Sequence, residues 1–369
     1  MAGFKIIKAK ETMTSRERIK RTFDFEKTDR VPIGYEANNL INRKLIEALG
    51  VPAVELKRVL GMDYIGVLAE YSGDDLFEEM PGRLTNQEFG HRTRWIGNPS
   101  GGGYLDYCDF PLKDADDETI NNYPVPNPDD YDYESIGVII ANNRDLAVHV
   151  GNPGFGDVIN SMGMIMGMED ILVNLHCEHE PTLNLIKRRA DSYLGVLDRI
   201  LSKYKGEIDF MWLGEDLGTQ IAPMISLEKF RAIIKPIHKL FVDLADVYSI
   251  PTIIHTCGSS SWAFEDFIEI GIRGVDTLQP EAANMSPRYL AEKFGGRLNF
   301  RGCISTAGAL TYGTADDVTN VCKETLETMM PHRGYHFAPT HLIQDNTPVE
   351  NVVAMYQAAH DFGVYQRLA

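Results

Sequence analysis

The chain has 369 residues, and its 36 lysine and arginine residues against 53 aspartate and glutamate residues give a formal net charge of −17. Because so acidic a surface repels phosphate backbones, we expect no nucleic-acid partner. A hydrophobic fraction of 44% with 24% charged residues is typical of a globular protein and excludes disorder, collagen and coiled coil as the main architecture. No apolar run approaches the roughly 18 residues of a membrane span. The opening segment lacks the apolar core of a secretory signal, so we expect a cytoplasmic protein without a membrane segment.

The cysteines are odd in number and widely spaced. That pattern, in a large chain without an export signal, favours reduced thiols. A cysteine with a functional role is then expected to be a metal ligand or a catalytic group in preference to a disulfide partner. The five are Cys108, Cys177, Cys257, Cys303 and Cys322.

Short runs rich in Val, Ile, Phe and Leu alternate with longer amphipathic stretches along most of the chain. Such runs, bounded by Gly, Pro or Asp, are typical of buried parallel strands. The predicted strands are Val31–Tyr35, Tyr64–Leu68, Leu146–Gly151, Ile208–Leu213, Pro251–His255, Arg273–Leu278, Leu298–Gly302 and Gly334–Ala338. The predicted helices are Asn38–Leu49, two helices within Glu169–Lys203, Ser226–Tyr248, Trp262–Ile270, Ser286–Phe294, Ala315–Met330 and Val349–Phe362. Eight strands with helices in most of the gaps predict an α/β fold, a (β/α)8 TIM barrel in preference to an open doubly wound sheet.

One stretch, Arg83–Asn127, does not follow this alternation. It is rich in Gly, Pro and Asp, and it holds two β-like runs, Phe89–Gly97 and Gly103–Phe110, around a turn at Asn98–Gly102. We interpret it as an inserted β-hairpin excursion, not as a second domain. The prediction is therefore a single barrel domain over residues 1–369, with an N-terminal arm at 1–30.

In a barrel, polar residues at the carboxyl ends of the strands face the active site. The fifth predicted strand ends in His255-Thr-Cys257, and an imidazole and a thiolate two residues apart can bind one ion. Zinc prefers such nitrogen and sulfur ligands, and a catalytic zinc has three protein ligands and one open position. Further ligands would come from His341, after the eighth strand, and from Glu215 or Asp216, after the fourth. A bound zinc would lower the pKa of a thiol substrate or act as a Lewis acid on an oxygen.

Other polar side chains at the same strand ends are candidates for the substrate pocket: Glu36, Gln220, Gln279, Glu281 and Gln344. The carboxylates Glu215, Asp216 and Glu281 are candidates for an acid, a base or a ligand, or for an ion pair with a nearby arginine. Cys303 follows the seventh strand and is a candidate ligand, although a buried small hydrophobic residue explains it at least as well. The glycine-rich segment 151–156 fits neither a P-loop nor a dinucleotide fingerprint, so we predict a pocket wall there.

With these residues identified, the chain resembles the uroporphyrinogen decarboxylase superfamily over nearly all of its length. The entry segment 16–32 resembles that superfamily's first helix and first strand, and Gly163–Leu175 resembles the helix before the middle of its barrel. Gly214–Gln220, His255–Gly258 and Phe337–His341 resemble the strand ends of its methyltransferase branch.

The chain departs from the decarboxylases of that superfamily just after the first predicted strand. Those enzymes carry an arginine-rich segment there, which holds the carboxylates of the porphyrinogen. Here the segment is Ile33–Asn39, with Glu36 in its middle and no arginine before Arg43. A site for a multiply anionic tetrapyrrole needs such cations, so decarboxylation of that substrate is not the expected activity.

The resemblance to the methyltransferase branch (methylcobalamin methyltransferases and the methyltransferases of O-demethylases) implies methyl transfer between a small substrate and the cobalt of a corrinoid. It also implies Zn²⁺ held by His-x-Cys and a later cysteine. His255 and Cys257 match, whereas the later cysteine falls at His341. The expected set is therefore His255, Cys257 and His341, with Glu215 as fourth ligand or nearby base and Asp216 beside it. Such a set makes zinc more electrophilic, which suits a methyl-ether oxygen at least as well as a thiol.

The chain has no Asp-x-His-x-x-Gly motif for cobalamin, so the corrinoid is expected on a carrier protein. The small-molecule partner would be an O-methyl compound or a thiol. The sequence determines neither the direction of methyl transfer nor whether the chain forms a homodimer. Two alternatives stand beside this reading. One is a metal-independent decarboxylase of the uroporphyrinogen type, and the other is a non-catalytic barrel that docks a corrinoid protein.

Overall fold

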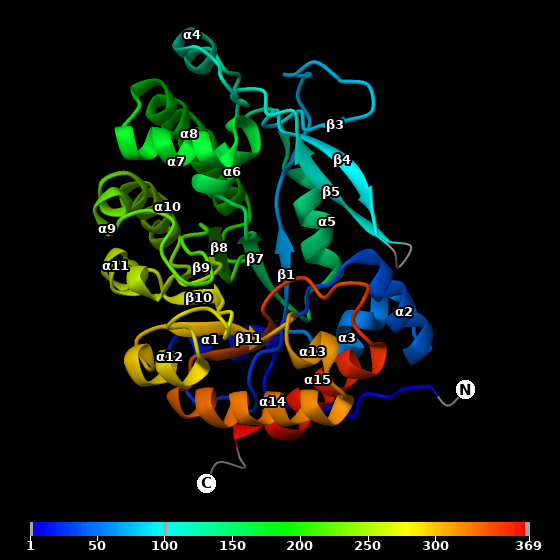
Figure 1. Cartoon of the computed structure of the whole chain (residues 1–369). Helices are drawn as coiled ribbons and strands as arrows, with labels where there is room; N and C mark the ends of the chain where they lie inside the picture. The colour runs from blue at the N-terminus through cyan, green and yellow to red at the C-terminus, as the bar shows by residue number, and fades with distance from the viewer. Residues whose placement is uncertain (1–2, 99–101, 366–369) are drawn as a thin grey trace.

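Seven parallel strands form one curled sheet in the computed structural model, which describes residues 3–98 and 102–365 (Figure 1). In sheet order the strands are β1 (Tyr64–Val67), β7 (Ala147–Gly151), β8 (Phe210–Gly214), β9 (Thr252–Thr256), β10 (Gly274–Thr277), β11 (Asn299–Ile304) and β12 (Tyr335–Pro339). Each one lies within a few residues of a predicted strand. The α/β class is thus confirmed, and the curled sheet is compatible with a TIM-like barrel.

The segment predicted as the first strand, Val31–Tyr35, lies between the two edge strands β12 and β1. The backbone N–H of Gly34 donates to the carbonyl of Phe337 at 2.8 Å, and that of Asp63 donates to the carbonyl of Ile33 at 3.0 Å. It is a single bridge and not a regular strand, because the N–H of Ile33 donates to the side chain of Asp63 instead of a neighbouring strand. The segment nevertheless occupies the position of an eighth strand.

Helices pack around the sheet, and one of them, the first in the chain, closes its amino end (Figure 1). They are α1 (Ser15–Phe23), α2 (Asn39–Leu49), α3 (Leu56–Leu60), α5 (Glu134–Asn142), α6 (Ile159–Met166), α7 (Met168–Cys177), α8 (Glu180–Lys203), α9 (Leu227–Lys229), α10 (Lys235–Val247), α11 (Phe264–Ile270), α12 (Pro287–Phe294), α13 (Ala309–Tyr312), α14 (Ala315–Met329) and α15 (Val349–Phe362). Their ends follow the chemistry of the sequence: Thr14 and Glu17 form a capping box at the start of α1, and Gly50 ends α2 in the left-handed conformation. A π-helical turn at Phe230–Ile234 joins α9 to α10, so the predicted helix Ser226–Tyr248 runs through three consecutive segments.

The stretch Arg83–Asn127 contains a small antiparallel sheet, which lies apart from α9–α12 (Figure 1). Its strands are β3 (Leu84–Thr85), β4 (Arg92–Gly97) and β5 (Gly103–Cys108), and α4 (Asp117–Asn121) follows. Two short strands, β2 (Glu70–Tyr71) and β6 (Tyr131–Asp132), pair antiparallel across the base of the stretch. The predicted turn between the two β-like runs includes residues 99–101, which lie outside the described residues. That this stretch is an insertion in a barrel stays a prediction.

The amino end of the sheet is filled by aromatic and aliphatic side chains from α1. Ile19 and Phe23 are buried in one cluster with Tyr64, Phe210 and Ile253 of the strands. The carboxyl ends of the strands lie at the other end of the sheet, where polar side chains can line a cavity. None of the helices within the described residues is both long enough and apolar enough to cross a bilayer.

Candidate metal centre

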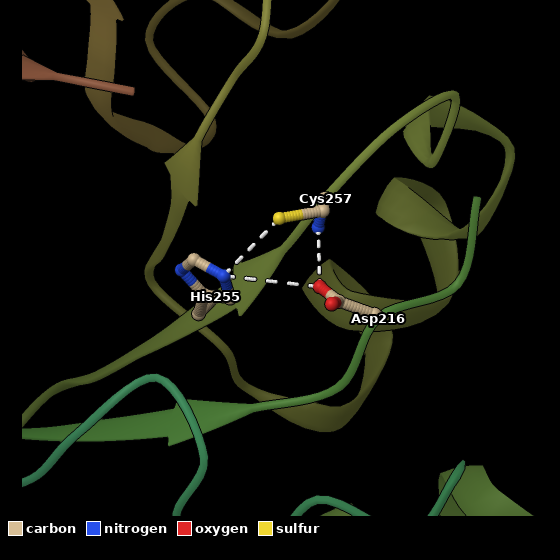
Figure 2. Close-up of side chains that lie close together, drawn as sticks. All are labelled: Asp216, His255 and Cys257. Carbon is tan, nitrogen blue, oxygen red and sulfur yellow. Dashed lines mark hydrogen bonds and ion pairs between the residues drawn. The ribbon is translucent and has the colours of Figure 1, made fainter. Parts of the chain in front are cut away.

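Three ligand-type side chains point toward one another at the ends of β8 and β9 (Figure 2). The ligand atoms of Asp216, His255 and Cys257 all lie within 4.8 Å of one another. Nε2 of His255 is 3.4 Å from Sγ of Cys257 and 3.8 Å from Oδ1 of Asp216. All three residues are partly buried. One nitrogen, one sulfur and one oxygen are a ligand set that fits zinc with an open fourth position.

Asp216 is held by hydrogen bonds to both of its oxygens. Oδ1 accepts the backbone N–H of Cys257 at 2.7 Å, and Oδ2 accepts the side-chain amide of Asn160 at 2.8 Å. Asn160 comes from α6, so one helix and one loop fix this carboxylate from opposite sides. The carboxylate therefore has a defined position beside the thiol before any ion binds.

Two glycines let the loops after β8 and β9 approach closely enough for this contact. Gly258 has φ +70°, and a Cβ there would collide with the carbonyl group of Gly218. A Cβ on Gly218 would in turn lie 2.5 Å from the backbone nitrogen of Ser259. That nitrogen donates to the carbonyl of Thr219 at 2.8 Å, so the two loops are joined by their backbones.

The imidazole of His255 is oriented from β10. Its Nδ1 lies 2.7 Å from Oδ2 of Asp276 and 2.7 Å from Oγ1 of Thr277. Burial acts to lower the pKa of His255, but its hydrogen bonds with Asp276 and Cys257 raise that pKa well above its usual range. Burial likewise acts to raise the pKa of Asp276, yet the charges of Arg301 and His255 hold it at about 2. Asp276 thus stays ionised and accepts the Nδ1 proton, which leaves Nε2 directed at the ligand position.

Arg301 lies beneath this pair and is almost fully buried. It forms ion pairs with both Asp276 and Glu36, and its Nε donates to the hydroxyl of Tyr64 at 2.6 Å. The guanidinium carbon lies 4.3 Å from the ring centre of Trp212. Two carboxylates and one aromatic face therefore already compensate this positive charge.

A cavity of about 600 Å³ opens over these residues. Its lining includes His255, Asp276, Arg301, Glu36 and His341, but neither Asp216 nor Cys257. The glycine-rich segment supplies residues 151–154 of the wall, as the sequence predicts. The volume is in the range of small-molecule sites.

Glu215, predicted as a fourth ligand or base, lies outside the ligand group. It is fully buried, and its two oxygens accept the backbone N–H groups of Val158 and Ile159 at 2.9 Å each, at the start of α6. Nε2 of His238 lies 3.2 Å from the same carboxyl group. Burial raises the pKa of Glu215 to about 8. The carboxylate beside His255 is Asp216, because successive side chains after β8 point in opposite directions.

His341, predicted as the third ligand, lines the cavity but is not in the ligand group. It is exposed, and its Nδ1 lies 3.5 Å from the carbonyl of Leu342. Cys303 is buried at the end of β11, and burial raises the pKa of its thiol above the usual range. This placement agrees with the hydrophobic interpretation of Cys303.

Of the predicted substrate-pocket residues, Glu36 lines the cavity, where it is paired with Arg301. The other four predicted residues are not among those that line it. The side-chain amide of Gln220 donates to that of Gln279 at 3.0 Å, outside the cavity, and Glu281 and Gln344 are exposed.

The sequence motifs do not identify two residues that position the ligand group, Asp276 and Asn160. Asp276 lies inside a predicted strand, and Asn160 lies at the start of a helix. A lone aspartate within an apolar strand is a usable signal, because a buried carboxylate needs a partner. Asn160 carries no comparable signal, since its contact with Asp216 depends on how α6 packs.

Comparison with known proteins gives one family match. Residues 209–362 match the family model described as uroporphyrinogen decarboxylase (URO-D). The match includes β8 to β12 and all three residues of the ligand group. It confirms the resemblance to that superfamily which the sequence motifs predict. No curated protein matches the sequence.

Two solved structures are similar in fold. A methyltransferase from Methanosarcina mazei has a TM-score of 0.67 and 15% sequence identity, and the alignment covers 95% of this chain and 99% of that one. Native xylanase 10B from Thermotoga maritima has a TM-score of 0.45 and 11% identity, with 95% and 98% of the two chains covered, and so weak a likeness carries no argument. At 15% identity the first match shows a shared fold.

Proposed function

We propose that this chain, whose residues 209–362 match the uroporphyrinogen decarboxylase family model, is a zinc-dependent methyltransferase of that superfamily's methyltransferase branch. It would move a methyl group between a small O-methyl compound, or a thiol, and the cobalt of a corrinoid held by a partner protein. The observation that carries the proposal is the group of Asp216, His255 and Cys257, of which His255 lines the cavity. The fold shared with the Methanosarcina methyltransferase supports it.

In this proposal Asp216, His255 and Cys257 would hold the zinc. His341, which lines the same cavity, stays the candidate for a further ligand, and Glu215 is not carried forward because its oxygens are bonded to α6. When bound, the zinc supplies Lewis acidity toward a substrate oxygen or lowers the pKa of a substrate thiol.

The side chains around the ligand group have separable tasks. Asp276 accepts the Nδ1 proton of His255 and so fixes which ring nitrogen faces the cavity. Arg301 keeps Asp276 ionised. Glu36 lines the cavity, and burial raises its pKa even though Arg301 acts to lower it. A methyl ether that loses its methyl group leaves an oxyanion that needs a proton, and Glu36 is the carboxyl group placed to supply one.

The charge arrangement disfavours the alternative of a tetrapyrrole decarboxylase. Arg301 is the arginine that lines the cavity, and both Asp276 and Glu36 already pair with it. A substrate with several carboxylates would find one further cation in the lining, Lys57, and would lie beside the ionised Asp276. A small substrate of low charge fits better.

A methyl-transfer assay tests this function. Zinc-loaded protein is incubated with cob(I)alamin and with methanol or a methoxylated aromatic compound, and the cobalt absorbance is followed. We expect methylation with the wild type and a loss of at least about 100-fold for Cys257→Ala, because a missing ligand removes the metal. Cys177→Ala, at an exposed cysteine of α7, is the matched control and keeps full activity.

Either alternative gives a different result. A protein that binds zinc and a corrinoid protein but transfers no methyl group from any donor would be a docking barrel. Consumption of a uroporphyrinogen by the metal-free protein would identify the decarboxylase instead.

A further inference from the structure

A second cavity, of about 370 Å³, lies next to the first and has no role in the methyl transfer proposed above. The two cavities share Leu68 and residues 152–154 as a common wall. The second one is large enough for a small organic molecule. Its walls come from α6, α8 and the stretch around β4 and β5, on the far side of the glycine-rich segment from His255.

The notable feature of this cavity is Arg189, a buried arginine of α8 that forms no direct ion pair within the described residues. It is only 5% exposed. Nη1 donates weakly, to the carbonyl of Ser161 at 3.3 Å and to Sδ of Met162 at 3.6 Å. Within residues 3–98 and 102–365, its Nε has no hydrogen-bond partner and no carboxylate lies within 4.0 Å of the guanidinium. A buried guanidinium that has an unused N–H and no carboxylate in direct contact can accept an anionic ligand.

The acidic groups of the cavity have other hydrogen-bond partners. Burial raises the pKa of Glu88, while the charge of Arg189 acts to lower it, and the hydroxyl of Tyr131 donates to this carboxyl group at 2.7 Å. Asp157 accepts two backbone N–H groups, at 2.9 and 3.4 Å. Burial lowers the pKa of His91 to about 4, so this imidazole adds no charge at neutral pH. Arg189 is therefore the group that can recognise a ligand by charge.

The walls around Arg189 are aromatic. The guanidinium carbon lies 4.7 Å from the ring centre of Phe89. The ring of Tyr193 lies 4.9 Å from that of Phe89 and 5.2 Å from that of Phe155, and Tyr107 lines the same cavity. Such walls favour a flat ring, and an arginine binds a carboxylate in a planar, two-pronged fashion.

We propose that this cavity binds a small aromatic carboxylate, with its carboxylate on Arg189 and its ring among Phe89, Phe155 and Tyr193. The site borders the candidate metal centre, because Asn160 lines the cavity and also donates to Asp216. Binding there requires neither a metal nor a methyl donor. The proposal can therefore hold or fail independently of the methyl-transfer function.

Calorimetric titration of the metal-free protein, with a chelator present, tests it. The probe is benzoate, and benzamide is the neutral ligand of the same shape. We expect benzoate to bind at least about tenfold more tightly than benzamide, because a hydrogen-bonded charge contributes that much or more. Arg189→Gln should lose at least the same factor for benzoate. Arg188→Gln, at the next residue of α8 and outside both cavities, should bind benzoate as the wild type does.

Three results would overturn the proposal. The first is the absence of any benzoate binding up to about 10 mM, a range that includes millimolar sites. The second is equal affinity for benzoate and benzamide. The third is unchanged benzoate affinity in a folded Arg189→Gln protein. The last would place benzoate elsewhere, for example in the first cavity. Thermal unfolding shows whether Arg189→Gln is folded. If it is not, the comparison of benzoate with benzamide on the wild type still tests the proposal.

Discussion

His255 is held from both sides of its ring. Asp276 and Thr277 lie at Nδ1, whereas Cys257 and Asp216 lie at Nε2. Thr277 adopts φ +82°, which β-branched residues rarely adopt, so the chain accepts local backbone strain where the hydroxyl meets the imidazole. Asp276 and Thr277 thus orient the ring from the side opposite the candidate ligand atoms.

Replacement of Asp276 tests this orientation. We expect Asp276→Asn to lower zinc affinity about 10- to 100-fold, since the carboxylate that fixes the ring of a metal-binding histidine contributes that much. Affinity would be measured by competition with a zinc-sensitive dye. Asp266→Asn is the control, because Asp266 is equally buried and ion-paired but lies on α11, away from the site. Equal zinc affinity in both variants would mean that Asp276 only balances the charge of Arg301.

The sequence singles out His255 and Cys257, because two ligand-type residues at a strand end carry a local signal, and the structure brings them together. It does not choose between Glu215 and Asp216. These neighbours point in opposite directions, and only the packing of α6 decides which one lies beside His255. Asp276 carries the signal of a lone aspartate in an apolar strand, whereas the contact of Asn160 depends on elements distant in sequence, which no local pattern contains.

Loops after adjacent strands create the ligand group, because Asp216 follows β8 and Cys257 follows β9. The close packing of Gly218 against Gly258 keeps these loops in register. The strand positions themselves follow from the alternation of apolar runs and turns, and all seven regular strands of the sheet were predictable. Segment 31–35 is the exception: its apolar residues resemble a strand, but Asp63 captures one of its backbone N–H groups.

A pair of glycine substitutions separates close packing from backbone strain. Gly258 and Gly50 have similar φ angles, +70° and +64°, but a Cβ at Gly50 would have nothing within 4 Å. We expect Gly50→Ala to cost about 1 kcal/mol of unfolding free energy and to leave zinc binding intact. Gly258→Ala should cost about 2–4 kcal/mol, strain plus overpacking, and should also weaken zinc binding. Urea unfolding and zinc titration provide the two readouts, and equal costs at both positions would refute the role of the glycine contact.

The molecule as a whole is closed at the amino end of its sheet by α1 and a buried charge network. Arg18 and Arg30 both pair with Asp63, and all three side chains are at most 2% exposed. Asp29 binds Arg18 at 2.7 Å and so extends the network to the segment before the first predicted strand. The candidate metal centre lies at the opposite end of the sheet, so this ion-pair network can stabilise the fold without contacting the metal centre.

Asp63→Asn is expected to destabilise the fold by about 3–5 kcal/mol, because it leaves two buried guanidinium groups without their shared carboxylate. Burial acts to raise the pKa of Asp63, but Arg30 and Arg18 hold it below its usual value. Its contribution to stability is therefore present above the unfolded pKa of about 3.9 and is lost as the pH falls through the folded pKa. Urea unfolding at pH 7 and at lower pH measures both effects.

Asp24→Asn serves as the comparison for that experiment. Asp24 pairs with Arg273 at the surface, with both side chains largely exposed, so its loss should cost no more than about 1 kcal/mol. A similar small cost for Asp63→Asn would show that the buried network does not stabilise the fold.

The metal content of the purified protein is the most direct test of the zinc site. It would be measured by elemental analysis on the wild type and on the His255→Ala, Cys257→Ala double variant. We expect about one zinc per wild-type chain and none in the variant, since both replaced residues would supply ligands of a site that needs three or four. A wild-type protein that is zinc-free and cannot be reloaded at neutral pH would refute the zinc site and leave a metal-independent activity to be sought.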